Sequence, residues 1–92
     1  MNVVPTIKTM LASELMVEIP LEQMRMDDSL RDAFGLDSLG FVELRVLCEQ
    51  AFDVVISDDD FSPENFSTLG EVVGLVERLI KEQENTNAQP TG

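Results

Sequence analysis

The chain has 92 residues and a formal net charge of −12 at pH 7, with 18 acidic side chains against 6 basic ones. This charge opposes binding to nucleic acid and to anionic membranes, and it favours contact with basic protein surfaces. The sequence contains no histidine, so the commonest general base and the commonest neutral metal ligand are missing, which argues against an enzyme.

A chain of this length forms one small domain, with little room for a deep active-site cleft. The lone Cys48 cannot form an internal disulfide, and Lys8, Ser13 and Glu14 interrupt the apolar positions that an N-terminal secretion signal requires. No apolar run approaches the roughly 20 residues needed to span a bilayer. We therefore expect a soluble, cytoplasmic protein that binds neither membranes nor nucleic acid.

The first predicted helix extends from about Val4 to Val17. Pro5 suits a helix start, apolar residues then recur at helical spacing, and Pro20 is incompatible with further helix. Residues 18–37 are mostly polar, and their second half, DDSLRDAFGLD, has Leu30, Phe34 and Leu36 scattered singly among charged residues. A loop of this length is more often functional than a plain linker, and it can contain a short turn of its own. We expect an ordered loop that these apolar residues attach to the core.

The second predicted helix begins at Asp37 or Ser38, which are both good N-cap residues, and ends near Phe52. The extended stretch DVVIS and an acidic run, DDD, follow it. The next segment, Ser62-Pro63-Glu64-Asn65, predicts a short helix of one or two turns, because a cap residue precedes proline at the first helical position.

The last predicted helix begins at a capping box, in which the side chains of Thr68 and Glu71 each satisfy a backbone N–H group. Its apolar positions recur at helical spacing: Leu69, Val72, Val73, Val76, Leu79 and Ile80. Residues 82–92 are almost entirely polar and predict a disordered tail, which leaves a domain over residues 1–81. The predicted fold class is all-α, a small bundle of three main helices plus one short helix.

The second helix carries two apolar stripes. One of them suits a core and consists of Phe41, Leu44, Cys48 and Phe52, with Leu47 and Ala51 beside them. The other, on a different side, consists of Leu39, Val42 and Val46 and is flanked by Glu43, Glu49 and Gln50. Both stripes belong to the core if other parts of the chain pack around most of the helix. The alternative is an exposed apolar strip with an acidic border, which would dock transiently on partners with a basic rim.

Ser38 is not a plausible nucleophile, because the chain has no histidine to act as its base and the GLDSLG stretch does not match the G-x-S-x-G elbow. A plain capping role is the structural alternative. If Asp37 supplies the cap, Ser38 lies in the first helical turn with a free hydroxyl, near the positive end of the helix dipole. A phosphate ester is favoured at that position, which predicts an acceptor of a phosphate-linked group.

The stretch FGLDSLGFVELRVLCEQAFDVVIS, residues 34–57, resembles the signature region of acyl carrier proteins. The resemblance covers most of the chain and implies an acyl-carrier-like four-helix bundle with no catalytic residue and no metal. It implies a phosphopantetheine group on Ser38, within the motif Asp37-Ser38-Leu39, whose terminal thiol carries the cargo as a thioester. It also implies that Leu39, Val42, Glu43 and Val46 contact partner enzymes.

The expected partners are a phosphopantetheinyl transferase, an acyl-loading enzyme, and acyltransferase or ketosynthase-type enzymes with basic surfaces. The resemblance is greatest to discrete, monomeric carriers of polyketide or hybrid polyketide/nonribosomal peptide pathways. Gly40 and Phe41 stand where fatty-acid carriers often have Asp-Thr, and the His of peptidyl carriers is missing. A fatty-acid synthesis carrier is the nearest alternative.

Two other classes stay open. One is a calcium-binding helical adaptor, suggested by Asp58, Asp59 and Asp60, although the EF-hand spacing is missing. The other is an acidic helical protein-interaction domain that uses the outward stripe without a prosthetic group. Such a domain would tolerate Ser38→Ala, whereas a carrier would lose its function.

Overall fold

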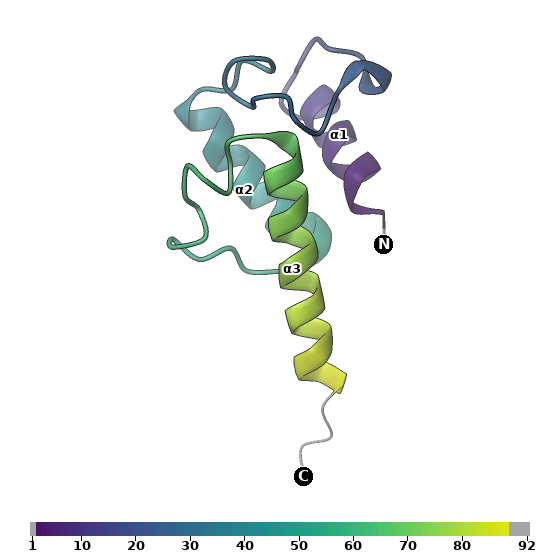
Figure 1. Cartoon of the computed structure of the whole chain (residues 1–92), viewed down its shortest axis with the longest axis vertical. Coiled ribbons are helices and arrows are strands. Elements are labelled where there is room, and N and C mark those ends of the chain that lie inside the picture. The colour runs from purple at the N-terminus through teal and green to yellow at the C-terminus, as the bar shows by residue number, and fades with distance from the viewer. Residues whose placement is uncertain (1, 89–92) are drawn as a thin grey trace.

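The computed structural model describes the backbone of residues 2–88 and the side chains of residues 2–84. The described part contains three α-helices and a short 3-10 helix, in the order α1 (Val3–Ser13), η1 (Leu21–Gln23), α2 (Ser38–Phe52) and α3 (Leu69–Ala88). The three α-helices contact one another, and the C-terminal part of α3 extends beyond the other two (Figure 1). The predicted all-α class is therefore confirmed. None of the described helices is both long enough and apolar enough to cross a membrane.

The core takes side chains from all three α-helices and from both long loops. The largest fully buried side chains are Ile7, Leu11, Leu30, Leu44, Cys48, Ile56, Leu69, Val72 and Val76. Leu30, Phe34 and Leu36 are all buried, which confirms that the loop between α1 and α2 is attached to the core. That loop also meets the start of α3 through a bridge between Ser29 and Thr68. The loop therefore positions the N-termini of α2 and α3 together.

Helix α1 ends at Ser13, earlier than the predicted end at Val17. The backbone turns at Met16, whose φ of 59° lies in the left-handed region that non-glycine residues rarely adopt. This turn allows the Val17 N–H to donate to the Leu11 carbonyl at 2.9 Å and buries the Val17 side chain. The prediction was wrong at this end because tertiary burial of Val17 outweighs the local helical pattern.

The predicted short helix at Ser62–Asn65 is absent, and a single turn stands in its place. The Ser62 side chain accepts the Asn65 N–H at 3.3 Å, as a cap does, and the Ser62 carbonyl accepts the Phe66 N–H at 3.1 Å. The chain then extends, because the Ser67 carbonyl accepts the Leu30 N–H at 3.0 Å. This pairing with the other loop ends the turn before a helix can form, and η1 is the short helix of the described fold.

Helix α3 begins as the capping pattern predicts, with Thr68 Oγ1 accepting the Glu71 N–H at 3.1 Å. It continues past Lys81 to Ala88 and so covers the first part of the predicted tail, 82–92. Glu82, Gln83 and Glu84 are good helix formers, which favours helix over the first residues beyond Lys81. Residues 89–92 lie outside the described residues.

Gly70 allows the closest approach between α3 and the preceding loop. Its N–H donates to the Met26 carbonyl at 2.7 Å, and a Cβ at this position would lie 2.9 Å from the same backbone oxygen. Gly74, one turn later on α3, has nothing within 4 Å of the corresponding position. We therefore expect Gly70→Ala to lower the free energy of unfolding by about 1–3 kcal/mol through this overlap. Chemical denaturation measures the change.

Gly74→Ala is the matched control on the same helix. It should raise the free energy of unfolding by up to about 1 kcal/mol, because alanine is the better helix former and meets no obstacle. If Gly70→Ala were stabilising to the same extent as Gly74→Ala, the close contact with Met26 would be disproved.

Candidate functional site

Ser38 is the first residue of α2 and is exposed to solvent. The preceding residue, Asp37, forms the N-cap with extended backbone angles, and its Oδ1 accepts the Gly40 N–H at 2.8 Å. Within residues 2–88 no group forms a hydrogen bond with Ser38 Oγ. Of the two candidate caps, Asp37 is therefore the one used, and the serine hydroxyl is left free at the positive end of the helix dipole.

Leu36 attaches the start of α2 to the core. Its side chain is buried, and its N–H donates to the Leu30 carbonyl at 3.0 Å. Gly40 packs directly over this residue, since a Cβ there would lie 3.2 Å from Leu36 Cδ2 and 3.3 Å from Asp37 Oδ1. Because Gly40 has no side chain, the Asp37 carboxylate has room to cap the helix. The first turn of α2, which includes Ser38, is thereby packed against the buried Leu36.

The outward stripe of α2 is exposed. The exposed fractions are 65% for Leu39, 47% for Val42 and 42% for Val46, whereas Leu44, Cys48 and Phe52 are buried. The interpretation with one core stripe and one surface stripe is confirmed for Leu44, Cys48 and Phe52, and the alternative in which both stripes are core is wrong. Phe41, the first residue of the predicted core stripe, is only half-buried. We call Leu39, Val42 and Val46 the apolar strip. It lies on the same helix as Ser38.

Only part of the expected acidic border faces solvent. Glu43 is exposed, but Glu49 accepts the Ile56 N–H through Oε2 at 2.8 Å. Arg45 donates to the Ile56 carbonyl at 2.6 Å, pairs with Asp58 at 3.1 Å, and lies 5.0 Å from the ring centre of Phe61. Two side chains of α2 therefore hold both backbone groups of Ile56 and attach the 53–61 loop to the helix. Sequence periodicity could not reveal this role of Glu49.

The thiol of Cys48 takes no part in the site. The side chain is fully buried on the inner stripe, and burial, with a smaller contribution from the charge of Glu49, raises its pKa to about 12. Because the thiolate is the reactive form, this thiol stays protonated and unreactive near neutral pH. The core position predicted for Cys48 is confirmed.

A groove lined by aromatic side chains begins at Phe41, less than one turn after Ser38. It has a volume of about 530 Å³ and is lined by Ser29, Arg31, Asp32, Phe41, Phe61, Ser62, Pro63, Phe66 and Ser67. The rings of Phe61 and Phe66 meet edge to face at 4.9 Å, and the Arg31 guanidinium lies 5.9 Å from the ring centre of Phe41. Sequence reasoning missed this groove, because its walls come from three distant segments and only their aromatic content could have indicated it.

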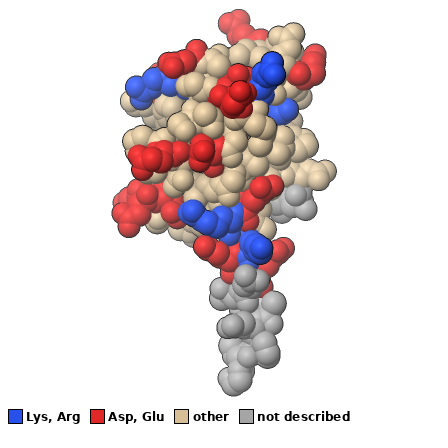
Figure 2. Space-filling view, viewed as in Figure 1, with Lys and Arg blue, Asp and Glu red and all other residues tan. Residues whose placement is uncertain are grey.

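Figure 2 shows groups of acidic side chains spread over the face, with fewer basic ones among them. Residues 58–60 are the three aspartates that suggested a calcium site. Two of them form ion pairs, Asp58 with Arg45 at 3.1 Å and Asp60 with Arg78 at 3.0 Å. Across the described side chains, no cluster of three or more potential metal ligands is arranged to hold an ion. The run therefore has a structural part in attaching the 53–61 loop.

Comparison with known proteins decides the family. The family model described as "Phosphopantetheine attachment site" matches residues 5–76, which include all of α2 and the apolar strip. The chain belongs to this family. A carrier of this kind has a covalently attached phosphopantetheine group and no catalytic activity of its own, and it works by interacting with enzymes.

Relatives of this carrier are named for two kinds of cargo, acyl groups and D-alanine. It is 33% identical to the acyl carrier protein of Desulforapulum autotrophicum over 78 residues, which are 85% of this chain and 97% of that protein. It is 30% identical to the acyl carrier protein of Clostridium acetobutylicum over 76 residues, 83% and 94% of the two chains. A D-alanyl carrier protein of Streptococcus pyogenes is 41% identical over 54 residues, 59% and 68% of the two chains.

The geometry at the start of α2 fits the prosthetic group of this carrier family. A phosphate ester requires an accessible hydroxyl and benefits from nearby positive potential, and the exposed Ser38 at the helix N-terminus offers both. Asp37 and Gly40 maintain that helix start without occupying the hydroxyl. Bound there, the group would supply a flexible arm with a terminal thiol on which acyl groups are held as thioesters.

Proposed function

We propose that Ser38 carries the phosphopantetheine group, with Asp37 and Leu39 completing the attachment motif. The strongest support is that Asp37, and not Ser38, caps α2. The Ser38 hydroxyl is therefore exposed and, among the described residues, has no hydrogen-bond partner. A transferase can then approach Ser38 from solvent. Ser38 Oγ attacks the phosphorus next to the pantetheine of coenzyme A, the pyrophosphate bond breaks, adenosine 3′,5′-bisphosphate leaves, and the transferase takes up the hydroxyl proton. The carrier supplies position and charge, and the transferase supplies the catalytic groups.

The apolar strip and Glu43 form the proposed docking surface for partner enzymes. Three exposed apolar side chains supply contact area, and Glu43 supplies a charge that orients a basic partner. The proposed partners are the transferase, an acyl-loading enzyme, and acyltransferase or ketosynthase-type enzymes, which a monomeric carrier meets in the cytoplasm. Contacts of this kind are weak and exchange rapidly, which suits a protein that must visit several enzymes in turn.

The proposed cargo is an acyl intermediate or extender unit of polyketide or hybrid polyketide/nonribosomal peptide biosynthesis. The Gly40-Phe41 pair, in place of the Asp-Thr that is frequent in fatty-acid carriers, supports this assignment. Fatty-acid synthesis is the alternative. The test is to isolate the protein from its producing organism, eject the arm in a mass spectrometer, and measure the mass of the attached group. A long saturated acyl chain would favour the alternative.

Incubation with coenzyme A and a broad-specificity phosphopantetheinyl transferase tests the carrier function itself. The intact mass should rise by one phosphopantetheine group per chain, and omission of coenzyme A should leave the mass unchanged. If the mass of the wild-type chain does not change under conditions that modify a known carrier, the proposal fails.

A further inference from the structure

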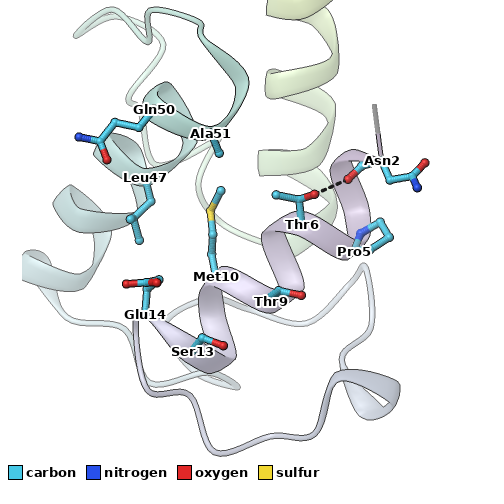
Figure 3. A pocket seen from close by; sticks show the side chains of 10 residues that line it. All are labelled: Asn2, Pro5, Thr6, Thr9, Met10, Ser13, Glu14, Leu47, Gln50 and Ala51. Carbon is cyan, nitrogen blue, oxygen red and sulfur yellow. Dashed lines mark hydrogen bonds between the residues drawn. The ribbon is translucent and has the colours of Figure 1, made fainter.

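A second groove, between α1 and α2, has no part in the function proposed so far. Its volume is about 590 Å³, and it is lined by Asn2, Pro5, Thr6, Thr9, Met10, Ser13, Glu14, Leu47, Gln50 and Ala51. Figure 3 shows side chains of α1 facing three residues of α2 across it, with Met10 lying between the two helices. We call it the α1–α2 groove. It lies beside α2, the helix that carries Ser38 and the apolar strip.

The lining has the chemistry that a lysine or arginine side chain requires. Met10, Leu47 and Ala51 offer apolar surface, and hydroxyl and amide groups surround it. Glu14 is the one charged residue of the lining, and within the described residues its carboxylate has no ion-pair partner. Long basic side chains place their aliphatic stems on apolar surface and keep the charged end near water or a carboxylate. The groove therefore suits one such side chain from a basic protein surface.

The α1–α2 groove is also continuous with the apolar strip. Gln50 lies one turn beyond Val46 on the same side of α2, and Gln50 also lines the groove. At 1.5 Å of rise per residue, Leu47 and Gln50 stand about 13 to 18 Å along the helix from Ser38. A specific interface buries roughly 800 Å² on each partner, an area roughly 30 Å across. An enzyme that covers both Ser38 and the strip therefore extends to this groove.

We propose that the transferase that modifies Ser38 inserts a lysine or arginine side chain into the α1–α2 groove, where its cation pairs with Glu14. This inference rests on the proposed function, because the transferase is the partner that attachment at Ser38 requires. It extends the docking surface from α2 to α1. Glu14 then determines how tightly the transferase binds and has no effect on the chemistry at Ser38.

The test compares Glu14→Lys with Glu22→Lys in steady-state assays of a broad-specificity phosphopantetheinyl transferase at saturating coenzyme A. Both glutamates are exposed, neither is on α2, and only Glu14 lines the groove, so the two variants change the net charge equally. Glu14 follows the last residue of α1, where a positive charge is compatible with the helix dipole, and the fold should persist. Circular dichroism verifies the fold of both variants.

We expect Glu14→Lys to raise KM for the carrier by about tenfold with kcat unchanged, because only binding is weakened. Glu14→Gln should raise KM by about threefold, and Glu22→Lys by less than about twofold. If Glu14→Lys and Glu22→Lys raise KM equally, a long-range charge effect is responsible and the inference is overturned. Failure of the wild-type chain to accept the group would refute the proposed function itself, so the two failures are distinguishable.

Discussion

A Ser38→Ala chain is expected to fold like the wild type and to gain no phosphopantetheine group at all. Alanine removes the only atom that the proposal assigns to attachment, Ser38 Oγ, and no other residue replaces it. The fold should be unaffected because the hydroxyl has no hydrogen-bond partner within residues 2–88 and the Asp37 cap is retained. We expect the free energy of unfolding to change by less than about 0.5 kcal/mol. Intact mass spectrometry and denaturation measure the two quantities.

Ser57→Ala is the matched control for this prediction. Ser57 is exposed like Ser38, but its hydroxyl accepts the Asp60 N–H at 3.1 Å, so its loss affects structure more than the loss of Ser38 does. The control chain should still be modified completely. An arm on the Ser38→Ala chain would contradict the account.

Val42→Asp is expected to reduce kcat/KM for the transferase by at least tenfold while the fold is retained. Val42 lies in the middle of the apolar strip and is 47% exposed, so an enzyme bound there would enclose an unpaired carboxylate. Enclosing such a charge, together with the loss of apolar contact, costs well over 1 kcal/mol of binding free energy, or roughly a factor of ten or more. Steady-state kinetics with varied carrier concentration gives this ratio.

Val55→Asp separates docking from a general effect of charge. Val55 is 79% exposed and lies in the 53–61 loop, outside the apolar strip. Its substitution adds the same charge and should change kcat/KM by less than about twofold, since added negative charge does not repel a basic partner. Equal losses in the two variants would show that the strip has no special role in docking.

The parts of the fold that the sequence predicts well are those specified by neighbouring residues. Asp37 and Thr68 cap the helices that follow them, and the bond from each side chain spans only three residues. The segments around Met16 and Ser62 were mispredicted, because their backbone follows distant partners in the core and in the other loop. Local pattern therefore predicts where α2 and α3 begin, and tertiary packing decides where α1 ends.

The candidate site also has some features that local sequence predicts and others that depend on tertiary packing. Helical periodicity predicts two stripes on α2, but only the packed fold shows that Leu39, Val42 and Val46 are the exposed ones. Periodicity cannot distinguish Glu43 from Glu49. The two differ because the loop after α2 folds back, so that the Ile56 N–H donates to the carboxylate of Glu49. Both grooves escape prediction for the same reason, since each forms only when separate segments pack together.

Localisation of the modification within the chain shows directly whether Ser38 carries the arm. The wild-type protein is treated with coenzyme A and the transferase, digested, and fragmented by tandem mass spectrometry, which ejects the arm from the peptide that carries it. The account predicts that the arm is found on Ser38 and on no other residue. An arm on another serine, for example Ser29 or Ser62 beside the aromatic groove, would contradict it.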